Sequence, residues 1–371
     1  MTDHPIFAQL IDFCETDVNS FIKNKTHNTP YPKALISRMA DMGLFGVNLP
    51  EKYGGSKIPA LLNIPINRLL SRYWLGLPAL YGIHLRSSQY LIAIGTQEQQ
   101  QTIVPNMAKG QLITTHAYHE KGIRDPHKFS TRLIKSNNHY VLSGTKEWVI
   151  NVHNANTIVV IAKTDNPDSI CNAVLINQGT PGMRIEENYY RRGLHGVSLS
   201  RIHFDNVNLS EEHIVGGHSA CAFKTATDFQ AMPYLNFSAR AVGVAESIVD
   251  LLKPYLRYSQ RESAAKTMIE YRWAEIQMIK ESIIAYFEQS VALHKAKKLT
   301  ESRAYRTKAF CTQTLVKLSN KAGTLCGGSG YAGDNQRLIQ QLIDAESLSF
   351  IDTPNEILIG LSGACELNTG Q

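Results

Sequence analysis

The chain has 371 residues, of which 43% are hydrophobic and 19% are charged, so it is long enough to bury the cores of two or three soluble domains. Its net charge of +6 comes without a dense run of Lys and Arg between aromatic residues, which argues against nucleic acid as a partner. We expect no membrane span and no signal peptide, because neither a long apolar run nor a basic stretch ahead of one occurs. The six cysteines are scattered without CxxC spacing, so we expect reduced thiols, a cytoplasmic protein and no metal site.

Helices are predicted at the start of the chain. Apolar side chains recur at near-helical spacing in residues 5–24, and 31–42 form a second helix. Residues 58–94 are apolar and helical in character. Thr96 is a suitable N-cap for a following helix that closes before Gly110.

From about residue 112 the apolar pattern changes to a period of two, which predicts strands. Asn137-Asn138 is typical of the turn of a hairpin. Short strands at regular spacing favour a small barrel or sandwich. The predicted strands are 131–135, 137–144, 147–150, 157–163, 172–177 and 200–208.

After residue 218 the chain is again predicted to be helical, with helices at 241–258, 268–293 and 301–325. The last of these runs into a double glycine, and one more helix follows it. That helix ends in a turn with a lone carboxylate, Asp352, which is placed where it can face a pocket.

Three stretches resemble the acyl-CoA dehydrogenase family, and the resemblance extends over nearly the whole chain. They are Met42-Gly-Leu-Phe-Gly-Val-Asn-Leu-Pro-Glu-Lys-Tyr-Gly-Gly55, Gly193-Leu-His-Gly-Val-Ser198 and Ala322-Gly-Thr-Leu-Cys-Gly-Gly-Ser-Gly-Tyr331. The resemblance implies a multidomain α and β fold. Its parts are an N-terminal helical domain (1–114), a middle β-barrel or sandwich domain (115–217) and a C-terminal four-helix bundle (218–371).

The resemblance also implies a reaction, the FAD-dependent α,β-dehydrogenation of an acyl thioester. In this family a carboxylate removes the α-proton while the β-hydrogen leaves as hydride to flavin N5. The base position matches Asp352, where the family usually has Glu, and Thr353-Pro354 replaces Gly-Thr. An Asp carboxylate reaches about 1.5 Å less far. Two interpretations stay open, namely that Asp352 is the base or that it is a helix-end residue in solvent.

Further positions match residues that hold FAD in the family. Trp148 corresponds to the tryptophan against the isoalloxazine, and Arg261 to the arginine on the pyrophosphate of a neighbouring subunit's FAD. Without the resemblance these would be a core tryptophan and a surface arginine. Gly327 and Gly328 correspond to backbone that approaches the partner's FAD, and the alternative is a plain helix C-cap. His119 and Ile150 stand where the family has hydroxyl residues that contact the flavin, and Glu356 is one more matched cofactor position.

Substrate contacts are implied at two positions. Arg124 lies in a loop that contacts flavin and pantetheine, and Tyr234 replaces an arginine that contacts CoA. An acyl-carrier protein would present the same pantetheine arm without the nucleotide, so either thioester is expected. The basic segment 294–298 is either a docking surface for an acidic carrier or a solvated helical face.

The resemblance further implies an electron acceptor such as an electron-transfer flavoprotein, and a homodimer or homotetramer. Two alternatives to the dehydrogenase hypothesis follow from the replaced positions. The first is a flavin-dependent oxygenase on the same fold, prompted by Ile150 and the altered turn at Asp352. The second is a degenerate, non-catalytic subunit that binds a partner.

Overall fold

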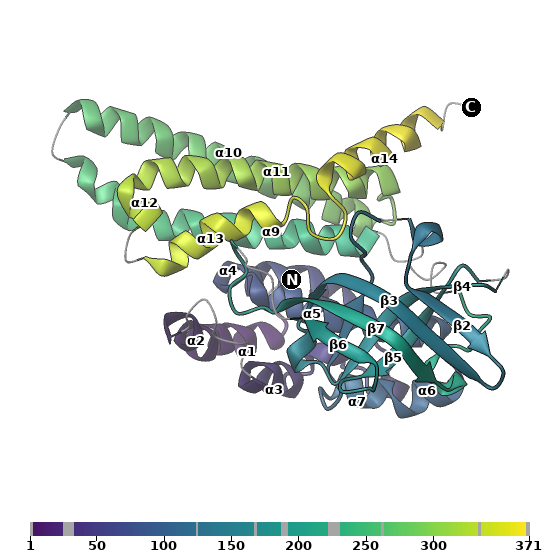
Figure 1. Cartoon of the computed structure of the whole chain (residues 1–371). Helices are drawn as coiled ribbons and strands as arrows, with labels where there is room; N and C mark the ends of the chain where they lie inside the picture. Colours follow the sequence, from purple (N-terminus) through teal and green to yellow (C-terminus); the bar gives the residue numbers. More distant parts are fainter. Residues whose placement is uncertain are drawn as a thin grey trace.

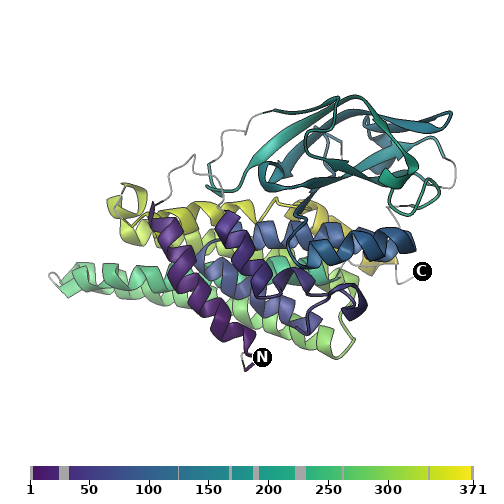
Figure 2. The same ribbon diagram turned by 90° about the horizontal axis from the view of Figure 1, so that it is seen from below.

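The structure is a computed structural model in which helical regions precede and follow a curled sheet along the chain, which confirms the predicted fold class (Figure 1). Seen from below, the sheet forms its own layer against the helices (Figure 2). Among the described residues, no helix is both long and apolar enough to cross a membrane. The described residues are 3–24, 33–123, 125–166, 169–186, 192–221, 231–260, 263–332 and 335–368.

The N-terminal helices confirm most of the predicted ones, but the predicted helix at 58–94 is divided in two. Trp74 adopts an extended conformation between α4 and α5, and a Cβ on Gly76 would lie only 2.3 Å from its ring. Thr96 caps α6 as expected. The helices are α1 (Ile6–Phe13), a π-helical turn (Cys14–Val18), α2 (Asn19–Asn24), α3 (Lys33–Asp41), α4 (Asn63–Tyr73), α5 (Gly76–Ile94), α6 (Gln97–Thr102) and α7 (Val104–Ala108).

The sheet has seven strands in the order β1-β4-β2-β3-β7-β6, with β5 paired to β4. The hairpin at Asn137 is confirmed, and that residue has the positive φ of 52° that such turns require. The prediction of separate strands at 137–144 and 147–150 is wrong, because β3 runs through both with a bulge between them. The strands are β1 (Thr114–Ala117), β2 (Arg132–Ser136), β3 (His139–Ile150), β4 (Thr157–Thr164), β5 (Cys171–Asn177), β6 (Met183–Glu186) and β7 (Leu199–Leu209).

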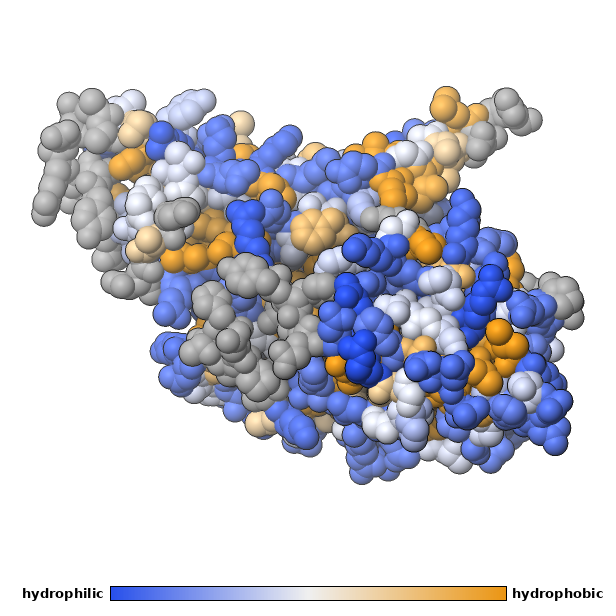
Figure 3. Space-filling model, viewed as in Figure 1, coloured by the Kyte–Doolittle hydropathy of each residue, from blue (hydrophilic) through white to orange (hydrophobic). Residues whose placement is uncertain are grey.

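The C-terminal helices pack through an apolar core formed mainly by α9, α10 and α11, with α13 laid across α9 and α11. α14 leaves apolar side chains on the surface, visible at the upper right of Figure 3. Those exposed residues include Ile359, Leu361 and Leu367. The helices are α9 (Ala231–Leu252), a 3-10 segment (Lys253–Gln260), α10 (Ser263–Lys295), α11 (Glu301–Cys326), α12 (Gly328–Ala332), α13 (Gln336–Ser347) and α14 (Asn355–Asn368).

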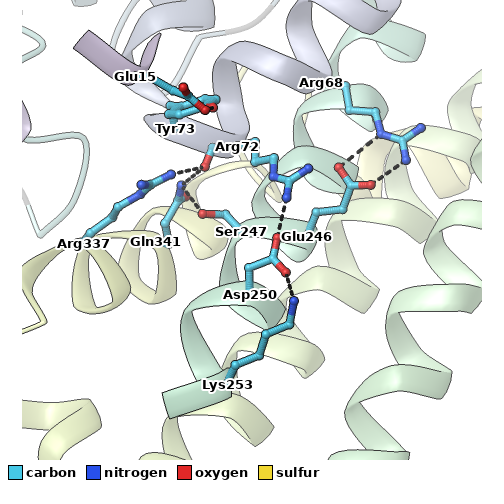
Figure 4. Close-up of polar contacts among 10 residues, drawn as sticks. All are labelled: Glu15, Arg68, Arg72, Tyr73, Glu246, Ser247, Asp250, Lys253, Arg337 and Gln341. Carbon is cyan, nitrogen blue, oxygen red and sulfur yellow. Dashed lines mark hydrogen bonds and ion pairs between the residues drawn. The ribbon is translucent and has the colours of Figure 1, made fainter. Parts of the chain in front are cut away.

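Polar contacts join the N-terminal helices to this bundle (Figure 4). Arg68 on α4 forms an ion pair with Glu246 on α9, and one turn later Arg72 pairs with Asp250. Gln341 on α13 donates to the backbone oxygen of Arg72 at 3.2 Å. These contacts hold α4, α9 and α13 in fixed relative positions.

A buried ion pair fixes the start of the β domain. Lys146 on β3 donates to Glu120 Oε1 at 2.9 Å and to the Tyr118 carbonyl at 2.9 Å. Glu120 also accepts from the Ser130 backbone at 2.7 Å and the Thr131 backbone at 3.0 Å. Although burial raises it, the charge of Lys146 and these hydrogen bonds bring the pKa of Glu120 down to about 2.

We expect Lys146→Met to lower the free energy of unfolding by about 3 kcal/mol, because it leaves Glu120 buried without its counter-charge. Urea unfolding at neutral pH measures the effect. The control is Arg132→Met, which removes the exposed pair with Asp165 (3.7 Å) and should change stability by less than about 0.5 kcal/mol. Equal effects of the two substitutions would contradict a stabilising role for the buried pair.

His84 joins α5 to α7 and β1 as a neutral imidazole. Its Nδ1 accepts from the Thr114 backbone N–H at 3.1 Å, so Nε2 carries the proton and donates to the Met107 carbonyl at 3.1 Å. Burial lowers the pKa of His84 to about 4. Protonation of Nδ1 would remove the bond to Thr114.

Because the pKa of His84 is lower in the folded state than its ordinary value of about 6.5, the unfolded chain binds more protons between these values. Stability should therefore fall as pH drops, by about 2 kcal/mol between pH 7 and pH 5 from this group alone. Urea unfolding of the wild type and of His84→Gln at both pH values isolates that contribution. An unchanged pH dependence in His84→Gln would show that His84 titrates normally.

Candidate functional site

One cavity of about 810 Å³ lies where α4, α5, the β domain, α9 and the turn before α14 meet. Five of the predicted site residues line it, namely His119, Trp148, Ile150, Tyr234 and Asp352. Gly327, Gly328 and Glu356 are not among its lining residues. Arg124 and Arg261 lie outside the described residues.

Trp148 reaches the cavity through an irregularity in the sheet. The register of β3 with β7 shifts between Lys146 and Val149, and Trp148 between them has a φ of 59°. Such a bulge turns a side chain away from the regular alternation of a strand. The indole is 49% exposed although it follows two buried residues. It therefore presents an aromatic surface to the cavity and does not belong to the core.

Asp352 lies in the turn between α13 and α14 and faces the cavity from an exposed position. Its φ of 63° is unusual for a residue with a side chain. Strained backbone of this kind persists only where the surroundings impose it, and it is concentrated at functional sites.

The buried side chain of Lys308 on α11 holds this turn. Its Nζ donates to the Thr353 carbonyl at 2.8 Å, the Ser349 carbonyl at 3.4 Å and Asn355 Oδ1 at 3.0 Å. Burial lowers the pKa of Lys308 to about 8, and the nearby charge of Asp352 opposes this change. The ammonium group of Lys308 thus fixes the turn against α11.

We expect Lys308→Met to destabilise the turn locally, because two backbone carbonyls lose their buried donor at a cost of about 1–3 kcal/mol. Amide hydrogen exchange in residues 349–355 should become faster, whereas exchange in β3 should not change. Lys317→Met, at an exposed position on the same helix, is the control. Unaltered exchange in this turn would show that Lys308 does not hold it.

Tyr234 lies at the start of α9 beside the same turn. Burial raises its pKa to about 12, and the charge of Asp352 adds to this effect. Its ring meets that of Tyr305 edge-on at 5.1 Å. The phenol is therefore a neutral hydrogen-bonding group at neutral pH and contributes no charge to the site.

His119 and Ile150 are held by the backbone of the β domain. The Glu147 N–H donates to the His119 carbonyl at 2.8 Å. The Thr115 hydroxyl donates to the Ile150 carbonyl, which fixes the end of β3. Ile150 offers only an apolar side chain to the cavity.

The double glycine ends α11 away from the cavity. Gly327 has a φ of 58°, and a Cβ on either glycine would meet no atom within 4 Å among the described residues. Glu356 lies in the exposed first turn of α14. Within this one chain these three residues line no common site with Trp148.

Two functional candidates escaped the sequence analysis, Arg86 on α5 and Arg240 on α9. Both line the cavity opposite the β domain, together with Asn67 on α4, and we name these three residues the helical floor. A signal existed for Arg240, which interrupts the small and apolar run Ser238-Ala-Arg-Ala-Val242. Arg86 lies in a mixed helix whose buried face the sequence does not define.

Comparisons with known proteins place the whole chain beside one family. Three domain models of acyl-CoA dehydrogenases match the chain, the N-terminal domain at residues 3–111, the middle domain at 119–207 and the C-terminal domain at 233–364. An acyl-CoA dehydrogenase of Bacillus subtilis is 25% identical over 93% of both chains.

Solved structures share the fold at lower identity. A butyryl-CoA dehydrogenase from Megasphaera elsdenii superposes with a TM-score of 0.88 at 21% identity, covering 99% of each chain. A prolyl acyl carrier protein oxidase superposes with a TM-score of 0.84 at 20% identity, covering 97% of each chain.

Proposed function

This chain belongs to the acyl-CoA dehydrogenase family of FAD-dependent EC 1.3 oxidoreductases, and we propose that it dehydrogenates an acyl thioester with Asp352 as the base. The observation that carries the proposal is the meeting of Asp352 and Trp148 at one cavity. Each comes from a different region of the chain, and each is presented by backbone with a positive φ. A carboxylate and an exposed indole at the same cavity suit proton abstraction beside a flat cofactor.

The cavity suits a flavin as far as this chain lines it. Trp148 offers a flat aromatic surface and Ile150 an apolar one. Among the buried polar atoms without a partner in the described chain are Asn48 Oδ1 and His116 Nε2, which belong to lining residues. FAD, when bound, supplies the hydride acceptor. We assign Trp148, Ile150 and His119 to its isoalloxazine end.

Asp352 takes the α-proton in this proposal. Its side chain is one methylene shorter than Glu, and the turn compensates by its backbone, since a positive φ redirects the Cα–Cβ bond. Lys308 donates to the carbonyl oxygen of the adjacent Thr353, so the backbone that carries the Asp352 carboxylate is held in one position. Tyr234 lines the cavity on the side of α9.

Asp352→Asn should retain FAD but lose bleaching of the flavin by the thioester under anaerobic conditions, at least about a hundredfold in rate. The measurement is the visible spectrum of the protein loaded with FAD, followed by stopped-flow mixing with CoA and acyl-carrier thioesters. Asp205→Asn, at an exposed position on β7 outside the cavity lining, is the control and should bleach normally.

Two results would contradict the proposal. Unchanged bleaching in Asp352→Asn would exclude Asp352 as the base. Absence of any flavin band in the wild type, even after incubation with FAD, would favour a non-catalytic subunit instead.

We also propose that the enzyme is a homodimer or homotetramer that passes electrons to an electron-transfer flavoprotein. The exposed apolar side chains of α14, which lie on more than one side of the helix, support an assembly, because several large apolar side chains gathered on one exposed helix are unusual on a monomer. In such an assembly Gly327, Gly328 and Arg261 are assigned to the FAD of a neighbouring copy. The substrate is a thioester of CoA or of a carrier protein.

A further inference from the structure

The helical floor contains a deeply buried arginine whose hydrogen bonds are incomplete. Arg240 is 7% exposed, and its Nε donates to Asn67 Oδ1 at 2.8 Å. Its guanidinium lies 4.6 Å from the centre of the Phe237 ring. The N–H groups on Nη1 and Nη2 have no acceptor within the described chain. Neither atom is among the fully buried atoms that lack a partner, so both are open to the cavity, where a ligand can accept from them.

The neighbouring helix leaves room for this side chain. Gly82 on α5 faces Arg240, and a Cβ there would lie 2.5 Å from Nη2. One turn along the same helix, Arg86 also lines the cavity. Both guanidinium groups therefore reach the space between α5 and α9.

The fixed charges of the cavity are not balanced. Among the lining residues, Glu147 is occupied by Arg201 at 2.7 Å. Asp352 acts electrostatically on both arginines, yet neither arginine forms an ion pair with a carboxylate in the described part of the chain. Arg86 also shares a hydrogen bond with Tyr90, so the two guanidinium groups have Asp352 as the one lining carboxylate that acts on both. In a low-dielectric cavity one more anion is favourable.

A further polar atom lies near the same floor. Asn236 is one helical turn before Arg240 on α9, and its buried Oδ1 has no partner among the described residues. An asparagine amide can present either its oxygen or its N–H₂ to a ligand. A hydrocarbon chain would leave Asn236 and Arg240 unsatisfied together.

We propose that the helical floor binds a carboxylate at the far end of the acyl group, so that the substrate class is an ω-carboxylated acyl thioester. This rests on the proposed function, which places the thioester beside Asp352. From there the acyl group extends toward Arg240, the more buried side of the cavity. Arg240 and Arg86 are specificity-determining residues that donate to the terminal carboxylate.

The experiment compares pairs of CoA thioesters that differ only in the terminal group: butyryl-CoA with succinyl-CoA, and pentanoyl-CoA with glutaryl-CoA. Dissociation constants are measured by isothermal titration calorimetry on the FAD-loaded protein without oxygen. The carboxylated member should bind at least about tenfold more tightly in one pair, the worth of one charged hydrogen bond. Equal or tighter binding of both neutral members would overturn the proposal and leave Asp352 as the counter-ion of both arginines.

Variants locate the effect. Arg240→Met and Arg86→Met should each remove most of the preference, and Arg240→Lys should keep part of it because the positive charge remains without the planar fork of donors. Arg68→Met, which removes an arginine paired with Glu246 and outside the cavity lining, should leave the preference unchanged. A preference that survives Arg240→Met and Arg86→Met alike would also overturn the proposal.

Bleaching of the flavin is recorded separately. Preferential binding of carboxylated thioesters without bleaching would support this inference while refuting the proposed dehydrogenation. If the neutral thioesters bind more tightly and bleach the flavin fastest, the proposed dehydrogenation would be supported and this inference refuted.

Discussion

The relative position of Trp148 and Asp352 depends on buried lysines. Lys146 holds the segment from Tyr118 to Thr131 against β3, two residues before Trp148. Lys308 holds the turn that carries Asp352. Burial lowers the pKa of both lysines to about 8. Each lysine ammonium lies in the low-dielectric interior of the protein and donates to several oxygen acceptors, so each segment has one well-defined position.

These lysines stabilise backbone conformations that would otherwise relax. A φ near 60° is unfavourable for Trp148 and for Asp352, and neither sequence position has a glycine to relieve it. Both side chains gain orientation in exchange, since the irregularity in β3 and the turn before α14 direct them to the cavity. The unfavourable backbone conformations therefore lie at the two residues whose side chains must be oriented for the proposed reaction.

The sequence predicted the elements well where periodicity and capping act locally. The helices of both ends, the hairpin at Asn137 and the cap at Thr96 follow from residue preferences and short spacings. The break at Trp74 was not predictable, because it depends on how the indole packs over Gly76. The bulge at Trp148 also escaped, since a register shift is a property of two paired strands and not of one.

Only those site residues that belong to motifs shared with the family were predicted from the sequence. Asp352, Trp148 and Tyr234 were found through the resemblance, and the structure brings them to one cavity. Lys308 and Arg240 were missed because a charged residue in a helix is normally read as solvent-facing. Their burial follows from the packing of α11 and α9 against neighbours more than 40 residues away in the chain.

The departures from the family pattern are not spread evenly over the molecule. Two of the motif glycines are under tight steric constraint, since a Cβ on Gly55 would lie 1.9 Å from the Leu49 carbonyl oxygen and one on Gly46 2.6 Å from the Ser56 nitrogen. These scaffold positions keep the family residue. The replaced positions Ile150, Tyr234 and Asp352 instead line the cavity. Loss of function with drift would be expected to alter scaffold and cavity alike. The replacements that line the cavity fit the proposed reaction on a different acyl group, and the arginines of the helical floor favour an acyl group that carries an anion.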